Sequence, residues 1–362
     1  MKKTKGLCEI CSPKQWKTIS TDMLTDGGYP VYGANGVIGC YSEYNHVEPT
    51  LLVTCRGATC GTLNICEPYS YVNGNAMALD NLTDEVDIKY LYYYLLNRGF
   101  EDVITGSAQP QIVRQSLQKV NVTYPDKERQ AEIVTVLERV SKLIALRKEQ
   151  LAKLDQLVKS RFVELFGKEK FSVTSLIELI TKGAGLSYGI IVPGDNVEDG
   201  VPMIRPSDFV NDKLYLDNVY RVTSAVEAKY AKTRLIGDEI LVQVIGQPGQ
   251  IMLSDSRCKG MNVTRNLAVV RPDCNKINRI YLKTYMQTQE AQAFMLGETK
   301  QSTLKQLPLG RLKELAVPVP PIDLQNQFAT FVEQTDKSKL AIQQSLDKLE
   351  LLKKSLMQKY FG

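Results

Sequence analysis

An internal repeat constrains the fold of this chain more than any other feature. Displacing the sequence by 195 residues aligns residues 125–167 with residues 320–362 without a gap. Thirteen of the 43 aligned positions are identical, among them Gln130 and Gln325. Each copy follows a longer segment, residues 1–124 and 168–319, and these two segments share little sequence. The fold must therefore place two similar elements after two dissimilar ones.

Both copies of the repeat predict long helices. After Pro125 and Pro321 neither contains proline or glycine before its final glycine, as expected for a helix with a proline start and a glycine stop. Apolar residues recur every three or four positions, a heptad pattern that needs a partner helix. The simplest partner is the other copy in the same chain. The predicted seam consists of Ile133, Leu137, Val140, Ile144, Leu151, Leu154, Val158, Phe328, Val332, Ile342, Leu346, Leu349 and Leu356.

The two longer segments share an order of elements. Each combines glycine-punctuated strand-like runs with an aromatic-rich helix and then a polar loop. The runs are residues 50–54, 62–65 and 76–79 in the first segment, and 239–244, 250–253 and 267–270 in the second. The helices are residues 88–96 and 280–286, and the polar loops are 106–111 and 297–303. We expect hairpin turns at the glycine pairs and packing roles for the tyrosines at 90–94. The fold class is α+β.

Charge and hydropathy set limits on the function. The net charge is +5, with 10 Lys and Arg against 12 Asp and Glu in residues 1–124, and 20 against 16 in residues 168–319. A protein that grips DNA unaided usually has a stronger basic footprint, so a DNA-binding chain of this kind would need a partner for part of the phosphate contact. No apolar run approaches the roughly 20 residues of a membrane helix. No apolar stretch follows the basic start, so we expect a cytoplasmic protein without a membrane partner.

Eight cysteines are expected to remain reduced thiols. Cys8 and Cys11 form one close pair, whereas Cys55 and Cys60 are more widely spaced. A structural zinc site usually has two well-formed ligand pairs, often with histidine, and His46 is the only histidine. Buried or idle thiols and no metal are therefore the prediction, with a zinc site as the alternative.

Sequence patterns of catalysis are missing. The chain has no phosphate-binding loop motif, and its only Pro-Pro pair, Pro320-Pro321, lacks the context of an amino-methyltransferase motif. The acidic residues are spread out rather than clustered, and one histidine nearly excludes serine or cysteine triads. We predict a protein that is not an enzyme and carries no cofactor.

Several motifs resemble those of type I restriction-modification specificity subunits. Residues 28–39, GYPVYGANGVIG, are similar to the opening of many of their target-recognition domains. Residues 200–208 resemble an alternative opening, and residues 237–241 resemble the family's GDIL strand. Residues 125–130 and 320–325 look like the P-x-x-E-x-Q start of each spacer helix. The motifs occur in the family's order, and the resemblance covers nearly the whole chain.

The resemblance implies a specific domain order: target-recognition domain 1 (1–124), spacer helix 1 (125–167), target-recognition domain 2 (168–319) and spacer helix 2 (320–362). It implies that the helices pack antiparallel as an intramolecular coiled coil in a pseudo-twofold repeat. Each domain would read one half of a split double-stranded DNA target. Modification subunits, which use S-adenosylmethionine to methylate adenine N6, would dock on this chain, and ATP-driven restriction subunits would join them. The acidic excess of residues 1–124 departs from this expectation.

Alternative functions remain at this point. The main one is a non-catalytic coiled-coil scaffold or protein-interaction module; a self-contained DNA methyltransferase would need motifs that the chain lacks.

Base reading requires polar or basic side chains on loops. In the first segment the candidates are Asn35, Arg56, Asn73, Asn75, Ser107, Gln109 and Gln111. In the second they are Arg205, Gln247, Arg257, Arg265, Asn266, Lys300, Gln301, Ser302 and Thr303. Among these candidates we rank first the residues in the two polar loops that precede the long helices.

Overall fold

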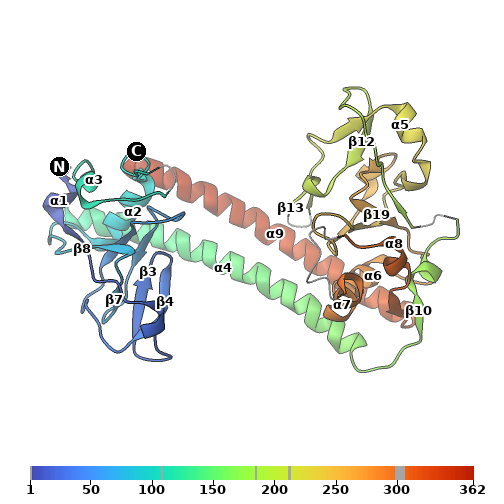
Figure 1. The fold of residues 1–362 in the computed structure, drawn as a ribbon, viewed down its shortest axis with the longest axis horizontal. Helices are drawn as coiled ribbons and strands as arrows, with labels where there is room; N and C mark the ends of the chain where they lie inside the picture. The colour runs from blue at the N-terminus through green and yellow to red at the C-terminus, as the bar shows by residue number, and fades with distance from the viewer. Residues whose placement is uncertain (1, 107–108, 184–185, 211–212, 298–305) are drawn as a thin grey trace. The chain divides into compact units, whose positions relative to one another are not determined.

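The computed structural model describes residues 2–106, 109–183, 186–210, 213–297 and 306–362. The chain divides into two compact units (Figure 1). Unit 1 consists of Met1–Gln150 and Ile342–Gly362, and unit 2 consists of Leu151–Ala341. Each unit therefore contains a part of both long helices. No helix in the described ranges is long and apolar enough to cross a membrane.

Unit 1 is a mixed α/β structure. Its elements are β1 (Lys3–Gly6), α1 (Leu7–Ile10), β2 (Ser12–Gln15), η1 (Thr21–Met23), β3 (Tyr29–Gly33), β4 (Gly36–Tyr41), β5 (Leu51–Thr54), β6 (Leu63–Ile65), β7 (Tyr71–Val72), β8 (Ala76–Asp80), α2 (Ile88–Arg98), α3 (Arg114–Leu117), β9 (Asn121–Tyr124) and the first part of α4 (Lys127–Phe166). Strands β2-β8-β5-β6 form an antiparallel sheet, β4-β3-β7 form a second sheet, and β1 pairs with β9.

Strand β5 is buried throughout because both of its faces are covered. Leu51 and Val53 belong to the main core with Leu91 of α2, whereas Leu52 packs with Tyr32 and its neighbours on the opposite face. Successive side chains of a strand point to opposite faces, so a strand between two layers needs a continuous apolar run. The predicted strand at 50–54 is thus explained by two-sided burial.

Unit 2 repeats this scheme with different residues. Its elements are the last part of α4, β10 (Val173–Ser175), η2 (Leu176–Leu179), β11 (Ser187–Tyr188), β12 (Val201–Ile204), η3 (Pro206–Asp208), β13 (Phe209–Val210), β14 (Lys213–Leu214), β15 (Tyr220–Val222), α5 (Ser224–Ala228), η4 (Ala231–Thr233), β16 (Ile240–Gln243), β17 (Ile251–Leu253), η5 (Ser256–Cys258), β18 (Asn262–Val263), β19 (Leu267–Val270), α6 (Arg279–Met286), α7 (Gln289–Leu296), α8 (Leu309–Lys313), β20 (Ala316–Pro318) and the first part of α9 (Ile322–Phe361). The sheets are β11-β19-β16-β17 and β15-β12-β18, with separate pairs β10-β20 and β13-β14.

The two units share hydrogen-bond patterns that sequence identity does not reveal. Strand β12 runs parallel to β18, as β3 runs parallel to β7. The hairpins β5-β6 and β16-β17 enclose the glycine pairs, which confirms the predicted turns. Tyr90 and Tyr281 are buried, and their hydroxyls donate to the carbonyls of Thr123 and Pro318, at 3.0 and 2.9 Å. For Tyr90 this confirms the predicted packing role.

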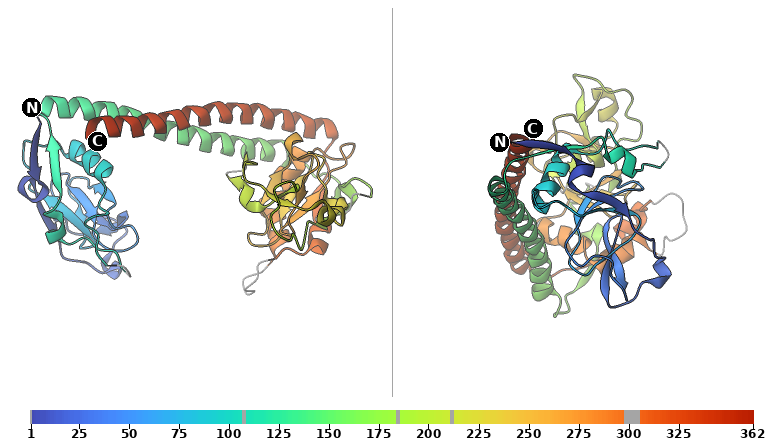
Figure 2. Two further views of the ribbon diagram at one scale, coloured as in Figure 1. Left: turned by 90° about the horizontal axis from the view of Figure 1, so that it is seen from above. Right: turned by 90° about the vertical axis from the view of Figure 1, so that its left-hand side faces the viewer.

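Helices α4 and α9, each of 40 residues, confirm the predicted long helices. Within unit 1, Lys148 pairs with Glu350 at 2.9 Å, and Arg129 lies 6.0 Å from the Tyr360 ring centre. Within unit 2, Asp155 pairs with Lys339 at 2.7 Å, and the Phe162 and Phe328 rings are 5.4 Å apart. Rising numbers in α4 meet falling numbers in α9, so the two segments run antiparallel within each unit (Figure 2).

The seam positions of both helices are buried or half-buried, and none is exposed. Polar residues at the same spacing find partners within α9 or on α4. The Thr335 hydroxyl donates to the Phe331 carbonyl at 2.9 Å, and Lys339 reaches Asp155. Long basic side chains can thus cover apolar surface while their charged ends reach an acid or solvent.

Gln130 and Gln325, identical between the repeats, fasten the start of α4 to unit 1 and the start of α9 to unit 2. Both are fully buried. The Gln130 amide accepts from the Asp87 N–H at 2.8 Å and donates to the carbonyls of Glu85 and Pro125 at 2.9 and 2.8 Å. Gln325 accepts from the Asn278 N–H at 2.8 Å and donates to the Pro320 carbonyl at 2.7 Å. Asp87 and Asn278 are the N-caps of α2 and α6, so one side chain joins two helix starts.

Candidate nucleic-acid interface

Three segments of unit 1 meet where strand β5 ends. The Cys55 N–H donates to the Asn75 carbonyl at 3.1 Å, and the Ile112 N–H donates to the Cys55 carbonyl at 3.0 Å. Arg56 and Gln111 form an antiparallel bridge. The β5-β6 hairpin, the turn before β8 and the loop before α3 are thereby joined side by side. We call this place the loop edge of unit 1.

Most of the predicted readers of unit 1 gather at this edge. Arg56, Asn75, Gln109 and Gln111 are exposed there. Asn35 is exposed in the β3-β4 turn, next to Ala34, whose carbonyl accepts a hydrogen bond from the Thr54 hydroxyl.

Asn73 does not belong to this group. It is only 3% exposed, donates to the Ile19 carbonyl at 3.2 Å and accepts from the Gly74 N–H at 2.8 Å. Its amide is committed to the fold, so we withdraw it as a base reader. Ser107 lies outside the described residues.

Unit 2 has an equivalent loop edge. The Val244 N–H donates to the Asn266 carbonyl, and the Leu307 N–H donates to the Val244 carbonyl, both at 2.8 Å. Ile245 and Gln306 form the bridge that corresponds to Arg56 and Gln111. The predicted readers Gln247 and Arg265 are exposed at this edge, and Asn266 is half-buried. The side-chain amide oxygen Oε1 of Gln247 accepts a hydrogen bond from the side-chain amide nitrogen of Gln250 at 2.8 Å.

Other predicted readers of unit 2 are not brought to the loop edge. Arg205 is half-buried and pairs with Asp208 at 2.9 Å. Arg257 lies beyond the opposite end of β17 and binds both carboxylate oxygens of Asp255. Both guanidinium groups are occupied by local acids, which weakens the prediction that they read bases. Lys300, Gln301, Ser302 and Thr303 lie outside the described residues.

Gln306 is a candidate that sequence reasoning missed. It is exposed and occupies the bridge position of the unit 2 loop edge. The signal was present in the sequence, because Gln306 lies 195 residues after Gln111, which is the displacement of the repeat. The 195-residue correspondence between the two halves of the chain thus continues upstream of Pro125 and Pro320.

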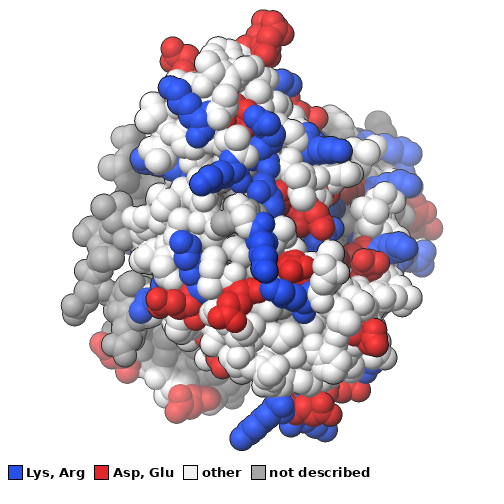
Figure 3. Space-filling view, turned by 90° about the vertical axis from the view of Figure 1, so that its right-hand side faces the viewer, with Lys and Arg blue, Asp and Glu red and all other residues white. Residues whose placement is uncertain are grey.

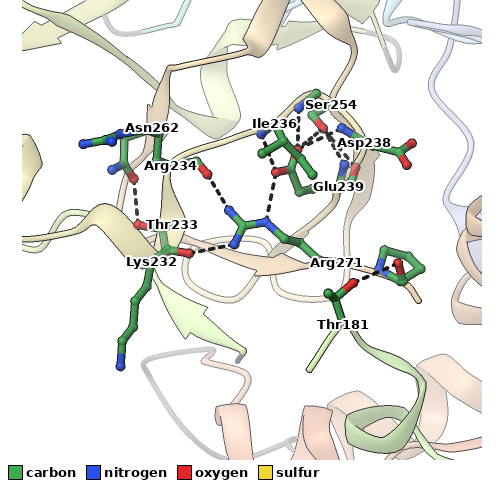
Figure 4. A network of polar contacts seen from close by, with 12 residues as sticks. Thr181, Lys232, Thr233, Arg234, Ile236, Asp238, Glu239, Ser254, Asn262 and Arg271 are labelled. Carbon is green, nitrogen blue, oxygen red and sulfur yellow. Dashed lines mark hydrogen bonds and ion pairs between the residues drawn. The ribbon is translucent and has the colours of Figure 1, made fainter. Parts of the chain in front are cut away.

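A buried polar network holds the start of β16 in unit 2 (Figure 4). The Glu239 carboxylate is fully buried, accepts from the Ser254 hydroxyl at 2.7 Å and meets Arg271 Nε at 3.2 Å. It also accepts from three backbone N–H groups of residues 236–238. Burial alone would raise the pKa of Glu239, but these donors outweigh it and hold the pKa below its ordinary value. The carboxylate is therefore charged at neutral pH and fixes the turn before β16.

Unit 1 has a charged contact at the start of the chain. One oxygen of Glu85 accepts from the Tyr124 hydroxyl at 2.8 Å, from Lys5 at 3.2 Å and from Lys3 at 3.3 Å. The hydrogen bond from Tyr124 and those from the two lysines lower the pKa of Glu85 to about 2. This contact ties the β1-β9 pair to the segment before α2.

Basic side chains on unit 2 are interspersed with acidic ones. Figure 3 shows Lys and Arg gathered in a row down one face of this unit, with Asp and Glu beside the row. Such a surface can contact phosphates along the row. The mixed signs agree with the modest excess of 20 basic over 16 acidic residues in residues 168–319.

The cysteines are free thiols, and Cys11, Cys55, Cys66 and Cys258 are buried. Burial raises the pKa of Cys11 to about 12 and that of Cys55 above its ordinary value. Thiols with raised pKa values are poor nucleophiles and poor metal ligands. Over the part of the chain that the structure describes, no three His, Cys, Asp or Glu residues are placed to hold a metal ion.

A match to a known protein family bears on the function of the loop edges. The family model for the type I restriction modification DNA specificity domain matches residues 1–156 and 168–352. The chain belongs to this family. The match confirms the resemblance found in the motifs and favours DNA sequence recognition over the coiled-coil scaffold.

Two curated relatives match this chain along most of their length. The EcoBI type I restriction enzyme specificity subunit of Escherichia coli is 24% identical over 362 residues, which covers 92% of this chain and 74% of the relative. A putative type I specificity subunit of Haemophilus influenzae, S.HindORF215P, is 21% identical over 364 residues, which covers 94% and 91%.

Solved structures show the same fold. The type I restriction-modification S subunit of M. genitalium has a TM-score of 0.64 at 18% identity, covering 100% of this chain and 96% of that one. A chain from a study of complex assembly and conformational transition of the type I R-M system has a TM-score of 0.55 at 14% identity, with 99% and 97% covered. These likenesses support the mixed α/β fold with two long helices.

Proposed function

We propose that this chain is the DNA-reading subunit of a type I restriction-modification complex and reads a split double-stranded target. The observation that carries the proposal is the pair of equivalent loop edges, built on matching backbone hydrogen bonds but from different residues. Two loop edges with the same backbone arrangement but different side chains suit a DNA target whose two halves differ. Residues 1–124 would read one half and residues 168–319 the other.

In this proposal the long helices set the distance between the half-sites. Residues 125–167 and 320–362 form an antiparallel intramolecular coiled coil in a pseudo-twofold arrangement. The antiparallel contacts within each unit and the buried seam positions support this account. A helix rises 1.5 Å per residue, so the length of the rods determines the unread spacer.

Modification and restriction subunits are the proposed protein partners, because the chain shows no catalytic motif of its own. Large apolar side chains remain exposed on the long helices, which is typical of surfaces that meet another protein. In unit 1 they are Leu143, Leu146, Leu351 and Leu352, and in unit 2 they are Leu157, Val163 and Leu340. The partners would supply S-adenosylmethionine chemistry and translocation, and part of the phosphate contact that the modest charge of this chain leaves unmet.

A domain replacement tests the proposal. The second reading domain of a related subunit replaces residues 170–315, and the chimaera is expressed with its modification subunits. Methylome sequencing should show that one half of the target changes while the other half and the spacer persist. As a control, the chain without modification subunits should leave DNA unmethylated. A replacement that alters both halves together would contradict independent reading.

A further inference from the structure

Gln111 and Gln306 occupy the same place in the two units. Both are exposed. Gln111 forms a β-bridge with Arg56, and Gln306 forms one with Ile245. Each partner is the second residue after a central strand, β5 in unit 1 and β16 in unit 2. The next residue in each case, Ile112 or Leu307, is buried and donates its N–H to the preceding hairpin residue. The backbone that directly follows each glutamine is therefore held to its hairpin.

The amides of these two glutamines are available. Gln111 and Gln306 form backbone contacts at the edge, but no other described residue hydrogen-bonds either side-chain amide. Gln243 and Gln292 of unit 2, by contrast, use their amides to bind backbone carbonyls at 2.9 Å or less. An exposed amide on a fixed backbone retains its donor and its acceptor for a ligand.

A glutamine amide matches one base edge well. Its oxygen accepts from adenine N6 and its nitrogen donates to adenine N7, a bidentate pair in the major groove. The major groove is about 12 Å wide, and both glutamines lie in exposed loops that isolated β-bridges join to a hairpin. We propose that Gln111 and Gln306 are equivalent specificity-determining residues, each reading one adenine in its own half-site. This inference rests on the proposed function.

The residue across the bridge makes the two half-sites differ. Directly opposed residues of an antiparallel pair have Cβ atoms about 5 Å apart, roughly one and a half times the 3.4 Å rise of one base pair, so their side chains can reach neighbouring bases. Arg56 is exposed and suits guanine O6 and N7, so the half-site of unit 1 contains a guanine next to its adenine. Ile245 is half-buried against the core of unit 2 and offers no donor. The half-site of unit 2 lacks that guanine contact.

The test selects DNA from a randomised library with the purified complex of the full chain and its modification subunits. Gln306→Arg should exchange an adenine preference for guanine at one position of one half-site, and Gln111→Arg should do so in the other half only. Arg56→Ile should relax the guanine requirement beside the Gln111 adenine. Each lost contact should reduce discrimination at its position about 5- to 150-fold. Gln289→Arg, on the exposed surface of α7, is the matched control and should change no base preference.

Two outcomes separate this inference from the proposed function. If the wild-type complex selects no split motif, the proposed function fails. If the wild type selects such a motif but Gln306→Arg and Gln111→Arg keep every base preference, this inference is overturned and the proposed function stands. Gln306→Glu keeps the size of the side chain and should also lose the adenine, because a carboxylate cannot donate to N7. It therefore decides the matter if the arginine variant folds poorly.

Discussion

Replacing Gln130 by leucine should weaken the attachment of the first long helix to unit 1. Leucine is at least as large as glutamine, so the change removes hydrogen bonds without opening a cavity. The Asp87 N–H and the carbonyls of Glu85 and Pro125 lose their partner at a site where Gln130 is 0% exposed. The perturbation therefore isolates the polar contribution of one side chain.

The magnitude follows from the number of groups left without a partner. A buried polar group without its hydrogen bond costs about 1–3 kcal/mol, and a carbonyl tolerates the loss better than an N–H. One N–H and two carbonyls then give a loss of roughly 3 kcal/mol in the free energy of unfolding. For a domain of this size each kcal/mol lowers the Tm by about 2–4 °C, so the transition of unit 1 should fall by roughly 6–12 °C.

Calorimetry and urea denaturation of the full chain measure this effect. Gln325→Leu is the matched variant in unit 2 and should destabilise that unit instead, since the Asn278 N–H and the Pro320 carbonyl lose their partner. Gln344→Leu, at an exposed position of α9, should stay within about 0.5 kcal/mol of the wild type. Equal stabilities for Gln130→Leu and Gln344→Leu would refute the reasoning.

Two further predictions concern buried and clustered charge. Glu239→Gln should destabilise unit 2 by about 3–5 kcal/mol, because Arg271, whose side chain is only 15% exposed, loses its buried partner. Because folding lowers the pKa of Glu239, its carboxylate contributes fully to the free energy of unfolding above the ordinary pKa of about 4.3, and this contribution is lost as the pH falls through the pKa of the folded state. Urea denaturation between pH 7 and pH 3 should therefore show a loss of stability in the wild type that Glu239→Gln lacks. The Glu85 carboxyl should titrate by NMR near its pKa of about 2, and Tyr124→Phe should raise that pKa by removing the hydroxyl donor; an unchanged value would contradict the assigned contact.

Much of the architecture could be predicted from local sequence. The gapless repeat, its heptad spacing and its terminal glycines predicted helices that the structure places at Lys127–Phe166 and Ile322–Phe361. The apolar runs predicted the central strands to within one or two residues, including β19 at Leu267–Val270. Helix and strand periodicities are properties of short windows, so they can be read without knowing what packs against them.

The candidate site was only partly predictable. Asn73 and Asn75 are two positions apart and chemically identical, yet Asn73 is buried and bonded to backbone while Asn75 is exposed at the loop edge. Arg257 looks as suitable as Arg56 in sequence, but Asp255 occupies its guanidinium. For Asn73 the deciding partner is the distant Ile19 carbonyl, and for Arg257 it is the nearby Asp255 carboxylate. Loop composition does not show which of these contacts forms.

The sequence by itself determined the repeat, the long helices, the central strand segments and the family. Only the tertiary structure decided which polar side chains remain free, because that depends on pairings such as Arg56 with Gln111 and Ile245 with Gln306, which join segments about 55 and 60 residues apart. Backbone hydrogen bonds across such distances set the register, and the register sets which face each side chain takes. For this reason Gln306 emerged from the fold, although its offset of 195 residues from Gln111 was already present in the chain.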